Sequence, residues 1–278
     1  MSARLATPRA ATWLVNGCLV LLAVLTLFPL LWMLSVSFMS TGASSTYPPP
    51  LLPAHFTLDR YRELFNQQHM GRYFLNSVIV ATCATLLALL FNALAGYAFA
   101  KLRFRGRESI YQLMLAGLLI PAQVTMIPLF GLLKMLGLVN SYAGVILPGV
   151  ASIFGIFLVR QYALSIPDEL LDAARIDGAS EWRLFRSVVA PLLVPILVTV
   201  GIFVFLGTWN DFMWPLIVLT DRDMQTLPVA LAGLSREHVQ DNELMMAGAV
   251  VTLLPVLALF LGLQRFYLRG IMLGSVKG

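Results

Sequence analysis

Long apolar runs alternate with shorter polar segments along the whole chain. A helix that crosses a bilayer needs about 20 predominantly apolar residues, and six runs approach or exceed that length. The pattern predicts an all-α polytopic membrane protein with six transmembrane helices. We expect a polar tail at residues 1–12 and a single transmembrane domain over residues 13–278. The predicted spans cover residues 13–38, 74–100, 110–133, 142–159, 192–219 and 245–267.

The first run is too long for the core of a signal peptide, and no small-residue cleavage site follows it closely. We therefore expect it to be retained as a span. The polar segment after it begins with a stretch rich in Ser and Pro that cannot form a regular helix. Thr57 is then suited to cap a short helix whose apolar stripe comprises Leu58, Tyr61, Leu64 and Phe65.

A polar segment at residues 165–191 separates the fourth and fifth predicted spans. It predicts two short helices, with Ser165 and Ser180 as their N-caps. Gly178 is suited to end the first helix, where a left-handed backbone is needed. Pro191 either ends the second helix or begins the next span.

This polar segment carries small side chains among many charged ones. Ala173, Ala174 and Gly178 would let another backbone approach closely, which favours a protruding knob that docks into another protein. An amphipathic loop lying on the bilayer surface explains the same residues. The pattern alone leaves both interpretations open.

The distribution of Lys and Arg predicts the orientation of the spans, because cytoplasmic loops are enriched in these residues. With both termini in the cytoplasm, thirteen of the 19 basic residues lie on the inner side and six on the outer side. The 165–191 segment is then cytoplasmic. The inner residues are Arg4, Arg9, Lys101, Arg103, Arg105, Arg107, Arg160, Arg175, Arg183, Arg186, Arg265, Arg269 and Lys277.

Composition supports this interpretation, since 59% of the residues are hydrophobic and only 12% are charged. The net charge of +5 follows from membrane orientation and needs no nucleic-acid partner. Cys18 and Cys83 both lie in apolar runs and imply neither a disulfide nor a metal site. His55 and His69 flank the short helix of the first polar loop, and we interpret them as solvated surface residues.

No motif for phosphate binding of the type Gly-x-x-x-x-Gly-Lys-Ser/Thr occurs in the chain. Neither HExxH nor GxSxG is present, and His55, His69 and His238 all fall in predicted outer loops. We therefore expect a transport subunit without enzymatic activity and without a cofactor of its own. If transport consumes ATP and magnesium, another polypeptide must bind them.

Asp211 is the acidic residue that the pattern places inside a predicted span, next to Asn210 and near its outer end. An acid in this position must face a cavity, a partner or the water interface. One interpretation is a hydrogen-bonding pair that lines a translocation path. The alternative is an interfacial turn in which Trp209 and Trp214 anchor the chain to the membrane surface.

The 165–191 segment resembles the "EAA" signature of bacterial ABC importer permeases. Asp172-Ala173-Ala174 is followed after three residues by Gly178 and after nine more by a segment that ends in Pro191. The chain has Asp172 where the family pattern has Glu, so its side chain has a shorter reach. The resemblance implies that this loop is the coupling helix that docks into an ATPase. The residues implied in coupling are Asp172, Ala173, Ala174, Arg175, Asp177, Gly178 and Pro191.

The stretch TWNDFMWPL around Asn210 and Asp211 resembles a pattern of carbohydrate-uptake permeases in the same superfamily. The resemblance, to the smaller six-span permease of maltose-type importers, implies import of an oligosaccharide, a disaccharide or a related solute. It also implies a bacterial inner-membrane location. The implied partners are a second homologous permease, an ABC ATPase dimer, a periplasmic or lipid-anchored solute-binding protein and membrane lipid.

Two other classes of membrane protein fit the hydrophobic pattern. A secondary transporter driven by an ion gradient would need more charged or polar groups inside its spans than this chain offers. A membrane scaffold would show no solute-dependent ATP hydrolysis in its complex. Association with an ATPase distinguishes both from an ABC permease.

Overall fold

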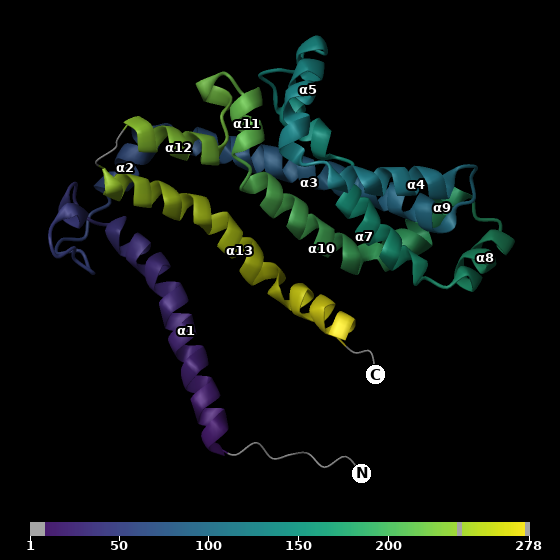
Figure 1. Cartoon of the computed structure of the whole chain (residues 1–278), viewed down its shortest axis with the longest axis horizontal. Coiled ribbons are helices and arrows are strands. Elements are labelled where there is room, and N and C mark those ends of the chain that lie inside the picture. The colour runs from purple at the N-terminus through teal and green to yellow at the C-terminus, as the bar shows by residue number, and fades with distance from the viewer. Residues whose placement is uncertain (1–8, 238–240, 276–278) are drawn as a thin grey trace. The chain divides into compact units, whose positions relative to one another are not determined.

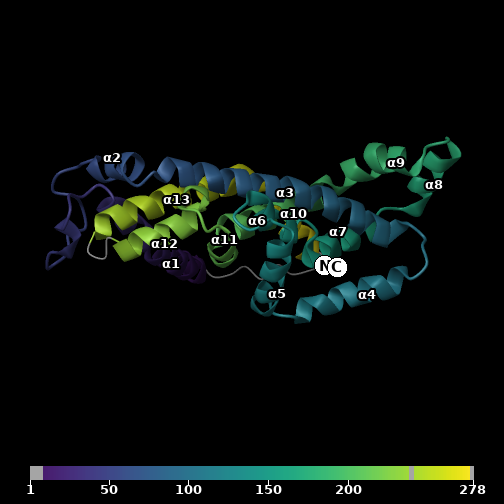
Figure 2. The same cartoon turned by 90° about the horizontal axis from the view of Figure 1, so that it is seen from above.

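The computed structural model describes residues 9–237 and 241–275, with side chains over 13–234 and 241–262. Every regular element in these ranges is a helix, which confirms the predicted all-α class. Four of these helices are long and apolar enough to cross a membrane, and two bent pairs raise the number of candidate spans to six. Figure 1 and Figure 2 show the helices from two directions.

The contacts divide the chain into two compact units. The first comprises Met1–Met70 and Leu231–Leu253, and the second comprises Gly71–Ala230 and Leu254–Gly278. The helices with residues in the first unit are α1 (Arg9–Val36), the 3-10 turn Ala43–Ser45, α2 (Asp59–Asn66), the end of α12 (Leu227–Glu237) and the start of α13 (Asn242–Ser275).

In the first unit, the Pro-rich loop folds back on the end of α1 although it contains little helix. Trp32 donates through Nε1 to the Pro50 carbonyl at 3.4 Å, and the Phe38 and Phe56 rings stack with centroids 4.4 Å apart. Leu64 on α2 is buried, whereas Leu58 and Phe65 remain exposed. Thr57 accepts from the Asp59 N–H, but α2 has Leu58 as its N-cap without a side-chain cap. The predicted short helix is confirmed, and its predicted apolar stripe is only partly buried.

Glu243, in the first turn of α13, fixes the start of this loop. Its side chain is fully buried at the start of α13. One carboxylate oxygen accepts the N–H of Ser44 at 2.7 Å, and the other accepts the N–H of Gly42 at 3.2 Å. A buried carboxylate is stable only when its oxygens are hydrogen-bonded, so this clamp holds residues 42–44 against α13.

We expect Glu243→Ala to destabilise the first unit by about 2 kcal/mol, because two backbone N–H groups lose their acceptor. Glu243→Gln keeps one carbonyl oxygen as an acceptor and should cost less. Thermal unfolding in detergent, together with amide exchange at Ser44, measures both effects. Equal melting temperatures for wild type and Glu243→Ala would contradict the clamp.

The second unit contains the remaining helices. They are α3 (Met70–Lys101), α4 (Arg107–Ala116), α5 (Ala122–Met135), α6 (Tyr142–Ile146), α7 (Ile153–Leu164), α8 (Asp168–Ile176), α9 (Glu181–Leu184), α10 (Ala190–Trp209) and α11 (Met213–Val218). Short 3-10 turns lie at Gly117–Leu119, Leu147–Gly149 and Arg222–Met224, and a π-helical segment covers Phe185–Val189.

The main core of this unit joins α3, α7, α8, α9 and α10. Helix α10 packs along α7, and Gly96 of α3 lies directly against Val159 and the backbone of Arg160 on α7. A side chain at residue 96 would collide there, so the glycine permits the close crossing. The buried members of the core are Ala93, Tyr97, Ala100, Val159, Ala163, Ile166, Leu171, Leu184, Phe185, Val189, Leu193 and Val200.

Two of the predicted spans are broken in the structure. The predicted third span bends by 107° between Arg107–Leu119 and Ala122–Met135, at Pro121. The predicted fourth span bends by 41° between Tyr142–Gly149 and Ile153–Leu164, where Ser152 caps α7 by accepting the Gly155 N–H. Proline removes a backbone donor and restricts the preceding residue, which explains the sharper bend.

The predicted fifth span has different limits from those expected. Helical structure runs without interruption from Glu181 through the π-helical segment to Trp209. Pro191 lies in the first turn of α10, directly after the π-helical segment, where the regular α-helical hydrogen-bond ladder is already interrupted. It therefore begins α10 without breaking the helical run, and Asn210 and Asp211 follow the end of α10 instead of lying inside it.

Candidate functional site

A short helical hairpin follows α7 in the sequence, as Figure 1 shows. It lies near the C-terminal end of α3, where Lys101 contacts Asp168. We call it the knob and define it as α8, the turn at residues 177–180 and α9. Gly178 has φ of +80°. The Ala179 N–H bonds to the Ala174 carbonyl and the Gly178 N–H bonds to the Arg175 carbonyl, both at 3.0 Å. This is a Schellman C-cap, so the predicted left-handed glycine is confirmed.

Of the two predicted serine caps, one is confirmed and one is wrong. Ser180 accepts the Arg183 N–H and caps α9. Ser165 instead ends α7, where its hydroxyl donates to the Tyr162 carbonyl at 2.7 Å. The N-cap of α8 is Pro167, without a side-chain cap. A serine near a helix end can bond backward as well as forward, and Ile166 and Pro167 separate Ser165 from α8.

One side of the knob is buried in the core of the second unit. Leu171 is 1% exposed and Leu184 is 0% exposed. Ala174 and Ala179 pack partly against the same core. Burying a leucine contributes about 2 kcal/mol, so these side chains hold the knob in place. Ala174 therefore lies on the inner side of α8 and is only partly available to a partner.

The other side of the knob is exposed and includes one large apolar residue. Ile176 is 86% exposed, and Ala173, Asp177 and Gly178 are exposed beside it. Apart from the immediate chain neighbours of Gly178, no described residue has an atom within 4 Å of the position that a side chain at residue 178 would occupy. The positive φ angle at residue 178 therefore favours glycine, whereas the space around it would admit a side chain. The exposed side presents a small apolar surface bordered by charge, as docking surfaces often do.

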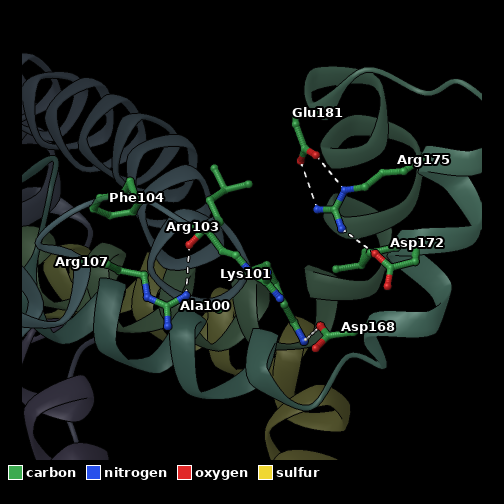
Figure 3. A pocket seen from close by; sticks show the side chains of 11 residues that line it. Ala100, Lys101, Arg103, Phe104, Arg107, Asp168, Asp172, Arg175 and Glu181 are labelled. Atoms are coloured by element: carbon green, nitrogen blue, oxygen red, sulfur yellow. Dashed lines mark hydrogen bonds and ion pairs between the residues drawn. The ribbon is translucent and has the colours of Figure 1, made fainter.

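Arg175 links the two helices of the knob through a group of charged side chains drawn in Figure 3. Its Nε lies 2.8 Å from Glu181 Oε1, and its Nη1 lies 2.9 Å from Asp172 Oδ1. Tyr97 of α3 donates its hydroxyl to Glu181 Oε2 at 3.0 Å. Asp172 and Arg175, implied in coupling by the family resemblance, are thus paired with each other.

Lys101 makes a second connection between α3 and the start of the knob. Its side chain is 7% exposed, and its Nζ lies 2.6 Å from the Ile166 carbonyl and 2.7 Å from Asp168 Oδ1. The hydrogen bond from Lys101 lowers the pKa of Asp168. The hydrogen bond to Glu181 raises the pKa of the Arg175 guanidinium, against the effect of desolvation. Asp168 and the Arg175 guanidinium therefore remain charged at neutral pH.

A cleft of about 860 Å³ separates the knob from the segment that follows α3. Both signs of charge line it, from the knob and from residues 100–107. Lys101 pairs with Asp168 across this cleft, whereas Arg175 pairs with Asp172 and Glu181 within the knob, so the cleft is a polar seam between the two segments. Figure 3 shows Asp168 pointing toward Lys101 and Arg175 lying between Asp172 and Glu181.

Asn210 and Asp211 lie elsewhere in the second unit and make local contacts. Asn210 donates to the Leu206 carbonyl at 2.8 Å, within α10. Asp211 Oδ1 accepts the Trp214 N–H at 3.4 Å and so closes the first turn of α11.

The two tryptophans beside this pair are buried in protein. Trp209 is 1% exposed, and Trp214 donates its indole N–H to the Gly144 carbonyl at 3.3 Å. The interpretation of these tryptophans as membrane-surface anchors is therefore wrong.

The remaining candidate residues form no recognised site. Among the described side chains, no group of three or more His, Cys, Asp or Glu residues could hold a metal ion. Cys18 and Cys83 are free and exposed. His238 lies outside the described residues.

Residues 88–272 match the family model described as "Binding-protein-dependent transport system inner membrane component". This match covers the end of α3, the knob and most of the remaining chain. The chain belongs to this family of inner-membrane transport components. It is a multi-pass protein of the bacterial inner membrane, and the family favours binding-protein-dependent import over transport driven by an ion gradient.

Relatives cover nearly the whole permease. It is 38% identical over 274 residues to the arabinooligosaccharide transport system permease protein AraQ of Halalkalibacterium halodurans, covering 96% of this chain and 97% of that protein. It is 38% identical over 254 residues to the diacetylchitobiose uptake system permease protein NgcG of Streptomyces coelicolor, covering 90% and 84%. It is 36% identical over 257 residues to the lactose transport system permease protein LacG of Rhizobium radiobacter, covering 92% and 93%.

A solved structure has the same fold as the permease. A bacterial ABC transporter chain involved in the import of the polysaccharide alginate superposes with a TM-score of 0.84 at 22% identity. The match covers 96% of this chain and 99% of that one. A second structure, of a bacterial alginate ABC transporter with its periplasmic protein, gives a TM-score of 0.64 at 13% identity, covering 91% and 93%.

Sequence reasoning missed the residues of the permease that hold the knob from outside it. Tyr97 and Lys101 belong to an apolar span and to a basic segment that we interpreted only as an orientation signal. Their shared role depends on a contact between segments about 80 residues apart, which periodicity along one segment does not reveal.

We expect Gly178→Ala to loosen the turn of the knob, because a Cβ in the left-handed region costs about 1 kcal/mol. Gly178→Asn is the matched control, since Asn tolerates this conformation. Amide exchange at residues 178 and 179, whose N–H groups form the C-cap, should accelerate in the alanine variant and change little in the asparagine variant. Equal protection in both variants would show that the left-handed angle is unimportant.

Proposed function

We propose that this permease is one transmembrane subunit of an ATP-driven importer that moves an oligosaccharide, a disaccharide or a related solute into the cytoplasm. The observation that carries the proposal is the exposed knob within the region matched by the family. The names of the relatives support the class of solute, because they refer to arabinooligosaccharides, diacetylchitobiose and lactose. Transport is its role, and ATP is hydrolysed on a partner chain.

The coupling partner is an ABC ATPase dimer that receives the exposed side of the knob. Ile176 provides the apolar contact, and Ala173 and Gly178 allow the ATPase backbone to approach closely. Asp172, Arg175 and Asp177 set the orientation of this contact, and Pro191 begins the helix that continues from it. The absence of a nucleotide-binding motif from the sequence supports a separate ATPase.

The complete importer contains a second homologous permease and a periplasmic or lipid-anchored solute-binding protein. The alginate transporter solved with its periplasmic protein supports the solute-binding protein as a partner, by similarity of fold. The six candidate spans and the Lys and Arg distribution support a topology with both termini, and therefore the knob, in the cytoplasm.

ATP binding closes the ATPase dimer and moves the docked knob, and the spans change from an inward-facing to an outward-facing arrangement. This is a shift between two populations. The ATPase must therefore bind the knob in both states, with an affinity that differs between them. Burial of Leu171 and Leu184 supports this mechanism, because a knob fixed to the core transmits displacement.

We expect Gly178→Asp to leave the permease inserted in the membrane while abolishing both co-purification with the ATPase and uptake. The added carboxylate lies on the proposed contact surface and is desolvated on docking. Gly178→Asn tolerates the same backbone angle without the charge and is the matched control. Uptake is measured with labelled arabinotriose, diacetylchitobiose and lactose. The docking proposal fails if Gly178→Asp retains ATPase binding and uptake.

Asn210 and Asp211 are proposed to line the translocation path near the outer end of α10. We expect Asp211→Ala to impair uptake or the ATPase stimulation by the binding protein, without loss of protein. Asp211→Asn separates the two possible causes, because Asn keeps an acceptor for the Trp214 N–H but carries no charge. Loss of uptake in both variants supports a role for the charge. Recovery in the asparagine variant assigns Asp211 to the capping of α11.

A further inference from the structure

The two covalent connections of the knob to the spans are irregular. On the α7 side, Ser165, Ile166 and Pro167 lie between two helices. On the α10 side, the connection is the π-helical segment Phe185–Val189. Such segments interrupt the regular hydrogen-bond ladder and often occur at functional sites. The orientation of the knob must therefore depend strongly on contacts through side chains.

The described hydrogen bonds that reach this hairpin and its α7 connection from elsewhere come from Tyr97 and Lys101 of α3, which is not adjacent to the knob in the sequence. Tyr97 is 3% exposed, donates to Glu181 and packs its ring 5.5 Å from that of Phe185. Lys101 binds the Ile166 carbonyl and Asp168 at the other end of the knob. The pair formed by Arg175 and Asp172 is more exposed and contributes little by itself. Hydrogen bonds of buried Tyr97 and Lys101 are worth more.

The opposite end of α3 holds a different loop. Asn76 donates to the carbonyls of Asp223 and Gln225, both at 2.9 Å, and accepts the Tyr142 hydroxyl at 2.7 Å. Ser77 accepts the Leu227 N–H at 2.7 Å. At 1.5 Å per residue, Asn76 and Tyr97 lie about 30 Å apart along one helix. Rigid secondary elements of this kind are able to carry coupling between distant sites.

We propose that α3 is a transmission rod between the knob and the 220–227 loop. Tyr97 and Lys101 are positioning residues at its cytoplasmic end, and Asn76 and Ser77 hold the loop at its outer end. This inference rests on the proposed function, because it requires the knob to dock on an ATPase and the 220–227 loop to face outward. Movement of the knob then displaces the outer loop through α3.

The test uses the full permease assembled with its second permease and ATPase in proteoliposomes. Cys18 and Cys83 are replaced by serine, and a fluorophore is attached at Thr220→Cys, an exposed position on the outer loop. The signal is the change in emission when ATP, magnesium and orthovanadate are added on the side of the ATPase. This probe requires no knowledge of the transported solute.

We expect Tyr97→Phe and Lys101→Met each to reduce this change by about fivefold while ATP hydrolysis and ATPase binding persist. Lys101→Arg keeps a buried cationic donor and should restore most of the signal. Tyr111→Phe is the matched control for Tyr97, because the buried Tyr111 hydroxyl has no hydrogen-bond partner in the described part of the chain. Arg105→Met is the control for loss of a cation from the same basic segment.

A double variant distinguishes transmission along α3 from two independent local effects at its two ends. Asn76→Leu, or the milder Ser77→Ala if the first does not assemble, should also reduce the signal. Sites this far apart normally have additive effects. If α3 transmits the displacement, Tyr97→Phe combined with the outer-end variant should be no worse than the more severe single variant.

The outcomes distinguish this inference from the proposed function. Absence of ATPase binding or of any ATP-dependent signal in the parent protein would overturn the proposed function and the rod together. A normal signal in Tyr97→Phe and Lys101→Met, or fully additive losses in the double variant, would overturn the rod alone. Loss of ATPase binding in Tyr97→Phe would assign Tyr97 to docking.

Discussion

Burial of Leu171 and Leu184 in the core shared by α3, α7 and α10 is the constraint on which the arrangement of the knob depends. Without it, α8 and α9 are too short to be stable helices in water. With it, one side of the hairpin is fixed and the opposite side, including Ile176, is left exposed. The C-cap at Gly178 then allows the chain to reverse while both helices keep this orientation.

Polar and charged residues around the knob fix its orientation, in addition to the hydrophobic contacts that attach it to the core. Tyr97, Glu181 and Arg175 form one connected group, and Lys101 binds the backbone of Ile166. Hydrogen bonds have narrow geometric requirements, whereas apolar contacts tolerate sliding. The combination explains how an exposed segment with irregular connections keeps a defined orientation. Asp172, the acidic residue of the family signature, is paired with Arg175 within its own helix because residues three apart are neighbours on a helix.

Features that depend on neighbouring residues were predictable from the sequence. The apolar runs predicted all-helical structure with candidate spans, and Gly178 and Ser180 were placed correctly because a C-cap and an N-cap each involve only a few adjacent residues. Ser165 was misassigned because two local hydrogen bonds compete for its hydroxyl. The interpretation of Trp214 as a membrane anchor failed for another reason, and for the same reason Glu243 was not singled out. Their partners, Gly144 and residues 42–44, are 70 or more positions away, and no local pattern reveals them.

The π-helical segment between α9 and α10 has a geometric consequence for the family signature. Successive residues of an α-helix are about 100° apart around its axis, and a π turn accommodates an additional residue. The faces of α9 and α10 are therefore out of phase, although the helical run is continuous. Conversion of Phe185–Val189 to regular α-helix would rotate the knob about the axis of α10. The number of residues between Gly178 and Pro191 thus determines the direction, around the axis of α10, in which the exposed Ile176 side chain points.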